Sequence, residues 1–122
     1  MTNGGHGQSK IRLMTISQGD IYWVTTNSAY MHPHVVIQVD ASTQTITLCA
    51  VTTNAKQATL PGNVLLETGE ANLSKPSIVV VSQVFTVEQA QLGEYIGTLS
   101  AQRVAQIQAG MRFIQRLTEY RT

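Results

Sequence analysis

The sequence predicts a mainly β fold with α: about five or six short strands form a small antiparallel barrel or a strongly curled sheet, and one amphipathic helix follows. Between residues 20 and 84, short segments rich in Thr, Val and Ile alternate apolar and polar side chains, as half-buried strands do. Near the C-terminus the apolar residues recur at steps of three and four, the period of a helix. Because the strands precede one long helix instead of alternating with helices, a parallel sheet is not expected.

Alternation and turn signals define the predicted strands one by one. Pro61-Gly62 is a turn signal between two of them, and the polar stretch 68–76 is expected to be a loop. The strand that starts at Ser77 has the longest β-branched run and should be the most buried. In chain order the predicted strands are Asp20–Thr25, Val35–Asp40, Thr43–Thr53, Asn63–Glu67 and Ser77–Val84, with Tyr95–Leu99 as a further candidate.

Two helices are predicted after these strands. The segment Thr86–Leu92 begins with capping-box spacing to Gln89, which predicts a short helix. Ser100 is placed to cap a longer helix that ends near residue 120. Gly110 interrupts this helix, which favours a close packing contact there. The apolar face of the long helix comprises Val104, Ile107, Met111, Ile114 and Leu117.

Composition limits the classes of protein that fit. The chain has 122 residues, enough for one domain, which we expect at residues 19–122 after a flexible leader at 1–18. Charged residues make up only 12 %, so neither a disordered chain nor a basic nucleic-acid arm is expected. The single Cys49 excludes an intramolecular disulfide and is expected to be a small buried hydrophobe. No apolar run is long enough for a membrane span, and we expect a cytoplasmic protein.

The most unusual motif is His32-Pro33-His34, at the start of the second strand. Residues two apart on a strand face the same way, so both imidazoles project from one face. Two imidazoles near neutral pH can supply a general base and a general acid. They could also bind a metal, but a third ligand at short spacing is missing, so no metal site is predicted. The structural interpretation is that they are simply two polar residues at the start of a strand, with no chemical role.

Thr52-Thr53-Asn54 closes the third strand and offers hydroxyl and amide groups where a loop begins. Such groups hold a phosphate in some proteins and only form a turn in others. No P-loop, G-x-G-x-x-G or G-x-S-x-G pattern occurs in the sequence, so both interpretations stay open.

Six motifs follow one another along most of the chain after the leader. They are GDIYWV at 19–24, HPHVVIQ at 32–38, AVTT at 50–53, LPGNV at 60–64, SIVVVSQVFTV at 77–87 and IGTLS at 96–100. In their order and their gaps, these motifs resemble the MazF/PemK family of toxin–antitoxin ribonucleases.

The resemblance implies a small SH3-like β-barrel with a C-terminal helix that assembles as a homodimer. It also implies cleavage of single-stranded RNA by attack of the ribose 2′-OH, without a metal ion or other cofactor, and neutralisation by a cognate antitoxin peptide. The family's catalytic pair falls at Thr52, where the threonine is kept, and at His32, where the family has arginine. The residues expected to contact RNA are His34, Thr53, Asn54 and Gln83.

The sequence departs from the family at positions where relatives carry charged side chains. Besides His32, Phe85 and Val80 stand where relatives carry arginine, and Ser82 stands where some carry aspartate. A guanidinium gives a permanent charge and a two-pronged contact to phosphate that a neutral imidazole does not give. Two outcomes follow: His32, with or without His34, replaces the arginine in a divergent ribonuclease, or the centre has decayed and the barrel binds RNA or an antitoxin. A third interpretation is a barrel that binds a small ligand or a metal through both histidines.

Overall fold

The computed structural model describes residues 15–26 and 29–121. Most of the predicted leader, residues 1–14, therefore lies outside the described residues. The strands are β1 (Asp20–Val24), β2 (His32–Asp40), β3 (Thr45–Thr52), β4 (Val64–Leu66), β5 (Ser77–Glu88) and β6 (Leu92–Thr98). Three short 3-10 helices, η1 (Ala55–Thr59), η2 (Glu70–Asn72) and η3 (Gln89–Gln91), lie between them, and the helix α2 (Ala101–Arg121) follows. No helix in the described part of the chain is long and apolar enough to cross a membrane.

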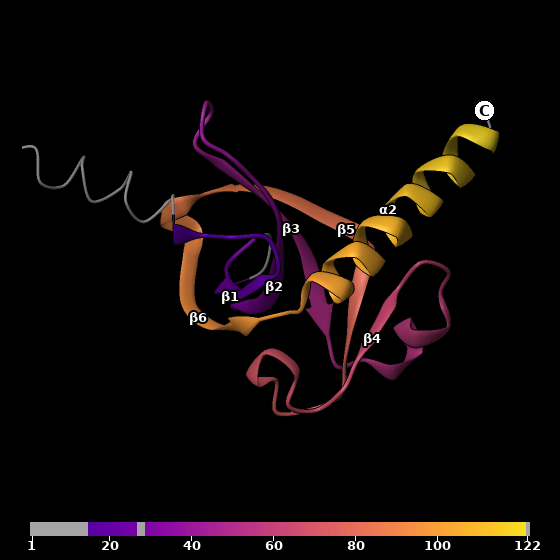
Figure 1. Ribbon diagram of the computed structural model, residues 1–122, viewed down its shortest axis with the longest axis horizontal. Helices are drawn as coiled ribbons and strands as arrows, with labels where there is room; N and C mark the ends of the chain where they lie inside the picture. The colour runs from indigo at the N-terminus through magenta and orange to yellow at the C-terminus, as the bar shows by residue number, and fades with distance from the viewer. Residues whose placement is uncertain (1–14, 27–28, 122) are drawn as a thin grey trace, which may run out of the picture.

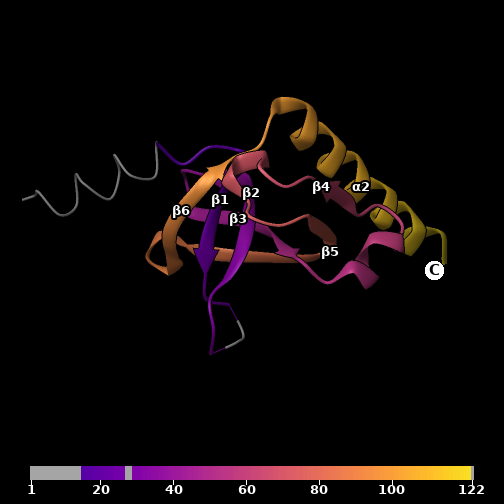
Figure 2. The same cartoon turned by 90° about the horizontal axis from the view of Figure 1, so that it is seen from below.

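The six strands form one antiparallel sheet in the order β4-β5-β3-β2-β1-β6. The sheet curls strongly, and β5 bends from the side of α2 around to β6 (Figure 1). Its edge strands β4 and β6 do not pair with each other, so the sheet does not close into a complete barrel. The helix α2 packs on β5 and β4 along one flank, as the second view also shows (Figure 2). The prediction of a mainly β fold with one C-terminal helix is confirmed.

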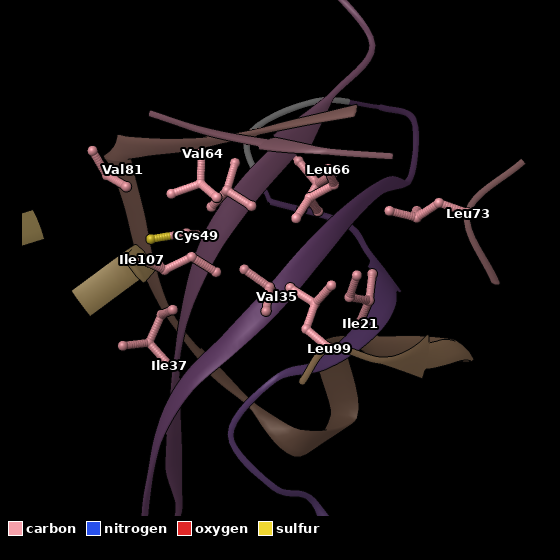
Figure 3. Packing of buried hydrophobic residues seen from close by; sticks show 12 residues of the cluster. Ile21, Val35, Ile37, Cys49, Val64, Leu66, Leu73, Val81, Leu99 and Ile107 are labelled. Atoms are coloured by element: carbon pink, nitrogen blue, oxygen red, sulfur yellow. The ribbon is translucent and has the colours of Figure 1, made fainter. Parts of the chain in front are cut away.

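Apolar side chains cover both faces of the central strands. Val35 belongs to a cluster between the sheet, β4 and α2, whereas its neighbour Val36 belongs to a second cluster on the opposite face. Figure 3 shows the first cluster, in which Ile107 of α2 lies near Cys49 of β3. The second cluster comprises Ile16, Val24, Val36, Ile46, Leu48, Val87 and Leu92. Burial on two sides explains the continuous apolar run of β2 and fixes its register.

The long helix follows its prediction closely. Its first turn is capped as expected, because Oγ of Ser100 accepts a hydrogen bond from the backbone amide of Arg103 at 3.2 Å. The Arg103 guanidinium also makes a two-pronged contact with the Glu70 carboxylate of η2, at 2.9 Å for each bond. The close contact predicted at Gly110 is confirmed, because a Cβ atom there would collide with the carbonyl oxygen of Gly62.

The helix predicted over Thr86–Leu92 is wrong for residues 86–88 and is reduced to one 3-10 turn, η3, over Gln89–Gln91. The strand β5 instead continues to Glu88, with Val84 to Glu88 paired to β3. A capping contact does occur, but one element later, where Oε1 of Gln91 accepts from the backbone amide of Glu88 at 3.0 Å. Pairing with β3 and burial of Val87 in the second cluster outweigh the local capping signal.

Candidate functional site

A bulge in β5 opens the sheet beside β3. Cys49 pairs with Val84, whereas the next residue along β3 pairs with Val80, so residues 81–83 bulge out of the ladder. The backbone amide of the first bulged residue is satisfied elsewhere, because it donates to Oδ1 of Asn63 at 3.0 Å. The bulge makes room for a pocket at the end of β3.

This pocket has a volume of about 250 Å³ and gathers polar side chains from three strands. His32 and His34 come from β2, Thr52 comes from the last position of β3, and Gln83 comes from the bulge of β5. Four of the six site residues predicted from sequence thus line one pocket. Its remaining walls are Thr26, Ala50, Val51 and Phe85.

His34 is buried but keeps one ring nitrogen available. Its side chain is 2 % exposed, and its ring meets the Phe85 ring edge-on, with centroids 5.4 Å apart. Nδ1 lies 2.8 Å from the backbone carbonyl oxygen of His32, and because a carbonyl only accepts, Nδ1 carries the hydrogen. With Nδ1 engaged by the backbone, Nε2 is the ring nitrogen left to act in the pocket that His34 lines.

Burial sets the protonation state of His34. It lowers the pKa of this imidazole below its ordinary 6.5, because an apolar surrounding penalises the imidazolium. The hydrogen bond to the His32 carbonyl acts in the opposite direction, and the charge of the His32 ring adds to the lowering. His34 is therefore neutral at pH 7 and presents an Nε2 lone pair, while His32 is exposed to solvent.

The side chains of Thr52, Thr53 and Asn54 have different surroundings in the structure. Oγ1 of Thr52 accepts from the backbone amide of Asn54 at 3.1 Å, which leaves its hydroxyl hydrogen free to donate. Asn54 caps η1, because its Oδ1 accepts from the backbone amide of Lys56 at 3.1 Å. Thr53 lines a different, mainly apolar pocket of about 380 Å³. Only Thr52 of the three lines the pocket with the histidines.

Four residues that line the pocket were not predicted as site residues: Thr26, Ala50, Val51 and Phe85. The sequence marks Phe85 only as a position where relatives carry arginine, although it lies two residues from Gln83 and lines the same pocket. Thr26 lies beyond β1, in the connection to β2, and no sequence signal marked it.

Formal charge is scarce around the pocket. None of its lining residues is Lys, Arg, Asp or Glu. In the part of the chain that the structure describes, no group of three or more His, Cys, Asp and Glu side chains is placed to hold a metal ion. The polar chemistry of the pocket therefore consists of two imidazoles, two hydroxyls and one amide, which transfer protons and donate hydrogen bonds.

The fold is that of the MazF toxins. It matches a mycobacterial endoribonuclease solved in complex with its cognate antitoxin, with a TM-score of 0.68 and 16 % identity over 82 % of this chain and 94 % of that chain. It also matches the Mycobacterium tuberculosis toxin MazF-mt6, with a TM-score of 0.63 and 19 % identity over 75 % of this chain and 91 % of that chain.

Sequence comparison identifies the family. The family described as PemK-like, MazF-like toxin of type II toxin-antitoxin system matches residues 17–114, and this chain belongs to it. Two similar curated relatives are Endoribonuclease MazF2 of Mycobacterium bovis and Endoribonuclease MazF6 of Mycobacterium tuberculosis. Each is 28 % identical over 109 residues, which cover 81 % of this chain and 96 % of the relative.

Proposed function

We propose that this chain is a metal-independent endoribonuclease that cleaves single-stranded RNA, with His32 in the role of the family's arginine and Thr52 as its catalytic partner. The observation that carries the proposal is the gathering of His32, His34 and Thr52 around one pocket. Membership of the toxin family and its curated endoribonuclease relatives support the substrate class.

The proposed reaction needs only proton transfer and charge stabilisation. The ribose 2′-oxygen attacks the adjacent phosphorus, the bond from phosphorus to the 5′ oxygen breaks, and the products carry a 2′,3′-cyclic phosphate and a 5′-OH. A base must take the proton of the 2′-OH, and an acid must return a proton to the departing 5′ oxygen. Nε2 of His34 suits the base, because it is unprotonated and accessible.

His32 and Thr52 complete the proposed machinery. The exposed His32 is suited, when protonated, to neutralise the phosphorane and to protonate the leaving oxygen. The hydroxyl of Thr52, held by its contact with Asn54, is suited to donate to a non-bridging phosphate oxygen. An imidazole lacks the two-pronged donor geometry of an arginine, so we expect the proposed contact of His32 to the phosphate to be weaker than the family's.

We further propose that the protein acts as a homodimer and is neutralised by an antitoxin peptide. Half-exposed apolar side chains, Leu65 of β4 and Phe113 of α2, line one open groove of about 650 Å³, which suits burial against a second copy. The related endoribonuclease solved with its cognate antitoxin supports the peptide partner. Light scattering after size-exclusion chromatography is expected to give the mass of two chains, and a strict monomer at micromolar concentration would contradict the dimer.

The test is cleavage of a mixed-sequence single-stranded RNA in excess EDTA, followed by mass spectrometry of the products. We expect fragments that end in a 2′,3′-cyclic phosphate, and no cleavage of the same oligonucleotide made as DNA. Cleavage of the DNA, or loss of activity in EDTA, would contradict the proposed mechanism. Binding of RNA without cleavage at any pH from 5 to 8 would instead support the decayed, binding-only interpretation, which the loss of arginine at Val80 and Phe85 favours.

A further inference from the structure

A row of three rings crosses the sheet beside the pocket. Tyr95 of β6 pairs with Tyr22 of β1, and Tyr22 pairs with His34 of β2. Directly opposed residues of antiparallel strands point to the same face. The Tyr22 and Tyr95 rings meet edge to face, with centroids 5.5 Å apart. The row therefore runs from an exposed tyrosine to the imidazole of the pocket.

Tyr95 is exposed and yet held in place. Its side chain is 51 % exposed, although its hydroxyl lies 2.5 Å from Oγ1 of Thr98. Thr98 donates its own hydrogen to Oδ1 of the buried Asp20 at 2.7 Å, so the Tyr95 hydroxyl must be the donor to Thr98. A ring fixed in this way loses little conformational freedom when a ligand stacks on it.

The scarcity of charge indicates how an RNA would have to bind. The residues that line the pocket include no Lys or Arg, and the formal net charge of the whole chain is only +1. Phosphate contacts from cations therefore contribute less than in a basic nucleic-acid-binding protein. Stacking of bases on aromatic rings is the other general source of affinity for single strands, and it needs no charge.

We propose that the Tyr95 ring is a stacking platform for one base of the single-stranded RNA whose scissile phosphate occupies the histidine pocket. Strands in a sheet lie about 4.7–4.9 Å apart, so Tyr95, two strands from His34, is about 10 Å away across the sheet. That spacing places the stacked base on a nucleotide next to the reacting one. The inference rests on the proposed function, because it assumes that RNA enters this pocket.

The test is the affinity of a fluorescently labelled, mixed-sequence RNA whose 2′ positions are all methylated, so that it binds without being cut. Tyr95→Ala is expected to weaken binding about 5- to 160-fold, the range for loss of one stacked base. Tyr95→Phe keeps the stacking surface and loses only the hydroxyl contact with Thr98, so its affinity should stay within about 3-fold of the wild type. Trp23→Ala is the matched control, because Trp23 is 40 % exposed and its side chain points to the opposite face of β1 from Tyr22.

An abasic scan makes the test specific to stacking. One base at a time is removed from the oligonucleotide, and one position is expected to weaken binding to the wild type and to Tyr95→Phe but not to Tyr95→Ala. Equal binding by wild type and Tyr95→Ala would overturn the platform while leaving the proposed function intact. A wild type that neither binds nor cuts RNA would overturn both. If Tyr95→Ala binds more weakly but still loses affinity at the same abasic position as the wild type, Tyr95 has a structural role and the proposed stacking is wrong.

Discussion

Nδ1 of His34 lies 2.8 Å from the backbone carbonyl oxygen of His32, and this contact fixes which nitrogen of His34 faces the pocket without a hydrogen. Because the acceptor is a backbone atom, a substitution of the His32 side chain leaves the contact in place. The two histidines can therefore be tested separately, one as the exposed cation and the other as the buried base.

The first prediction concerns the acid limb of the pH–rate profile. Because burial lowers the pKa of His34, its Nε2 stays unprotonated below the ordinary imidazole value of 6.5. As the pH is lowered, we expect kcat/KM to decline only below pH 6.5. We expect His34→Gln to reduce the rate by a factor on the order of 10² to 10⁴. A profile measured from pH 4.5 to 8 checks this. A His34→Gln enzyme with the wild-type rate would exclude His34 as the base.

The second prediction concerns stability against pH. The folded pKa of His34 is depressed, so the unfolded chain binds more protons than the folded one as the pH falls through about 6.5. His34 therefore lowers stability in acid, and stability returns as the pH rises above 6.5. We expect the wild-type Tm to fall between pH 7 and pH 5 more steeply than that of His34→Gln. Parallel Tm curves would show that the folded chain does not depress this pKa.

The third prediction concerns the contact between α2 and the turn before β4. Gly110→Ala gains about 1 kcal/mol of helix propensity, but the new Cβ meets the carbonyl oxygen of Gly62. We expect a net loss of about 1–3 kcal/mol in the free energy of unfolding, measured with urea. Gln115→Ala, an exposed change on the same helix, should stay within about 0.5 kcal/mol of the wild type. A stabilised Gly110→Ala would show that the contact is looser than described.

The fourth prediction concerns Cys49. Burial raises the pKa of its thiol to about 12, so almost no thiolate forms at pH 8 in the folded protein. We expect iodoacetamide to label Cys49 only after addition of denaturant. A free-cysteine peptide at the same pH gives the reference rate. Labelling of the native protein at the peptide's rate would mean that β3 opens readily near this residue.

The sequence predicts the elements of this fold better than their ends. Each strand of the sheet has a predicted counterpart, although β6 is predicted only as a further candidate and β4 is placed by a turn signal. The period of three and four identifies α2, because burial on one face leaves a regular pattern. Near Thr86 a capping signal suggested a helix, but pairing of β5 with β3 decides the structure there. Such pairing depends on residues about forty positions away, which a local pattern does not contain.

The candidate site was predicted in part for the same reason. The His-Pro-His motif and Thr52 could be singled out locally, and they do line one pocket. The bulge at residues 81–83 that completes the pocket appears only when β3 and β5 pair. The contact between Thr98 of β6 and Asp20 of β1, which leaves the Tyr95 hydroxyl as donor to Thr98, also joins distant elements, so no spacing in the sequence reveals it.

The most direct test of the proposed function is the single-turnover cleavage rate of mixed-sequence RNA in excess EDTA, from pH 5 to 8. Wild type, His32→Ala and His32→Arg are compared, with Gln108→Ala on α2 as the control. We expect His32→Ala to be slower by a factor on the order of 100 or more, because it loses the charge contact to the phosphorane. We expect His32→Arg to cleave RNA, because a guanidinium supplies the charge contact that we propose for His32. Cleavage by His32→Ala at the wild-type rate across this range would contradict the account.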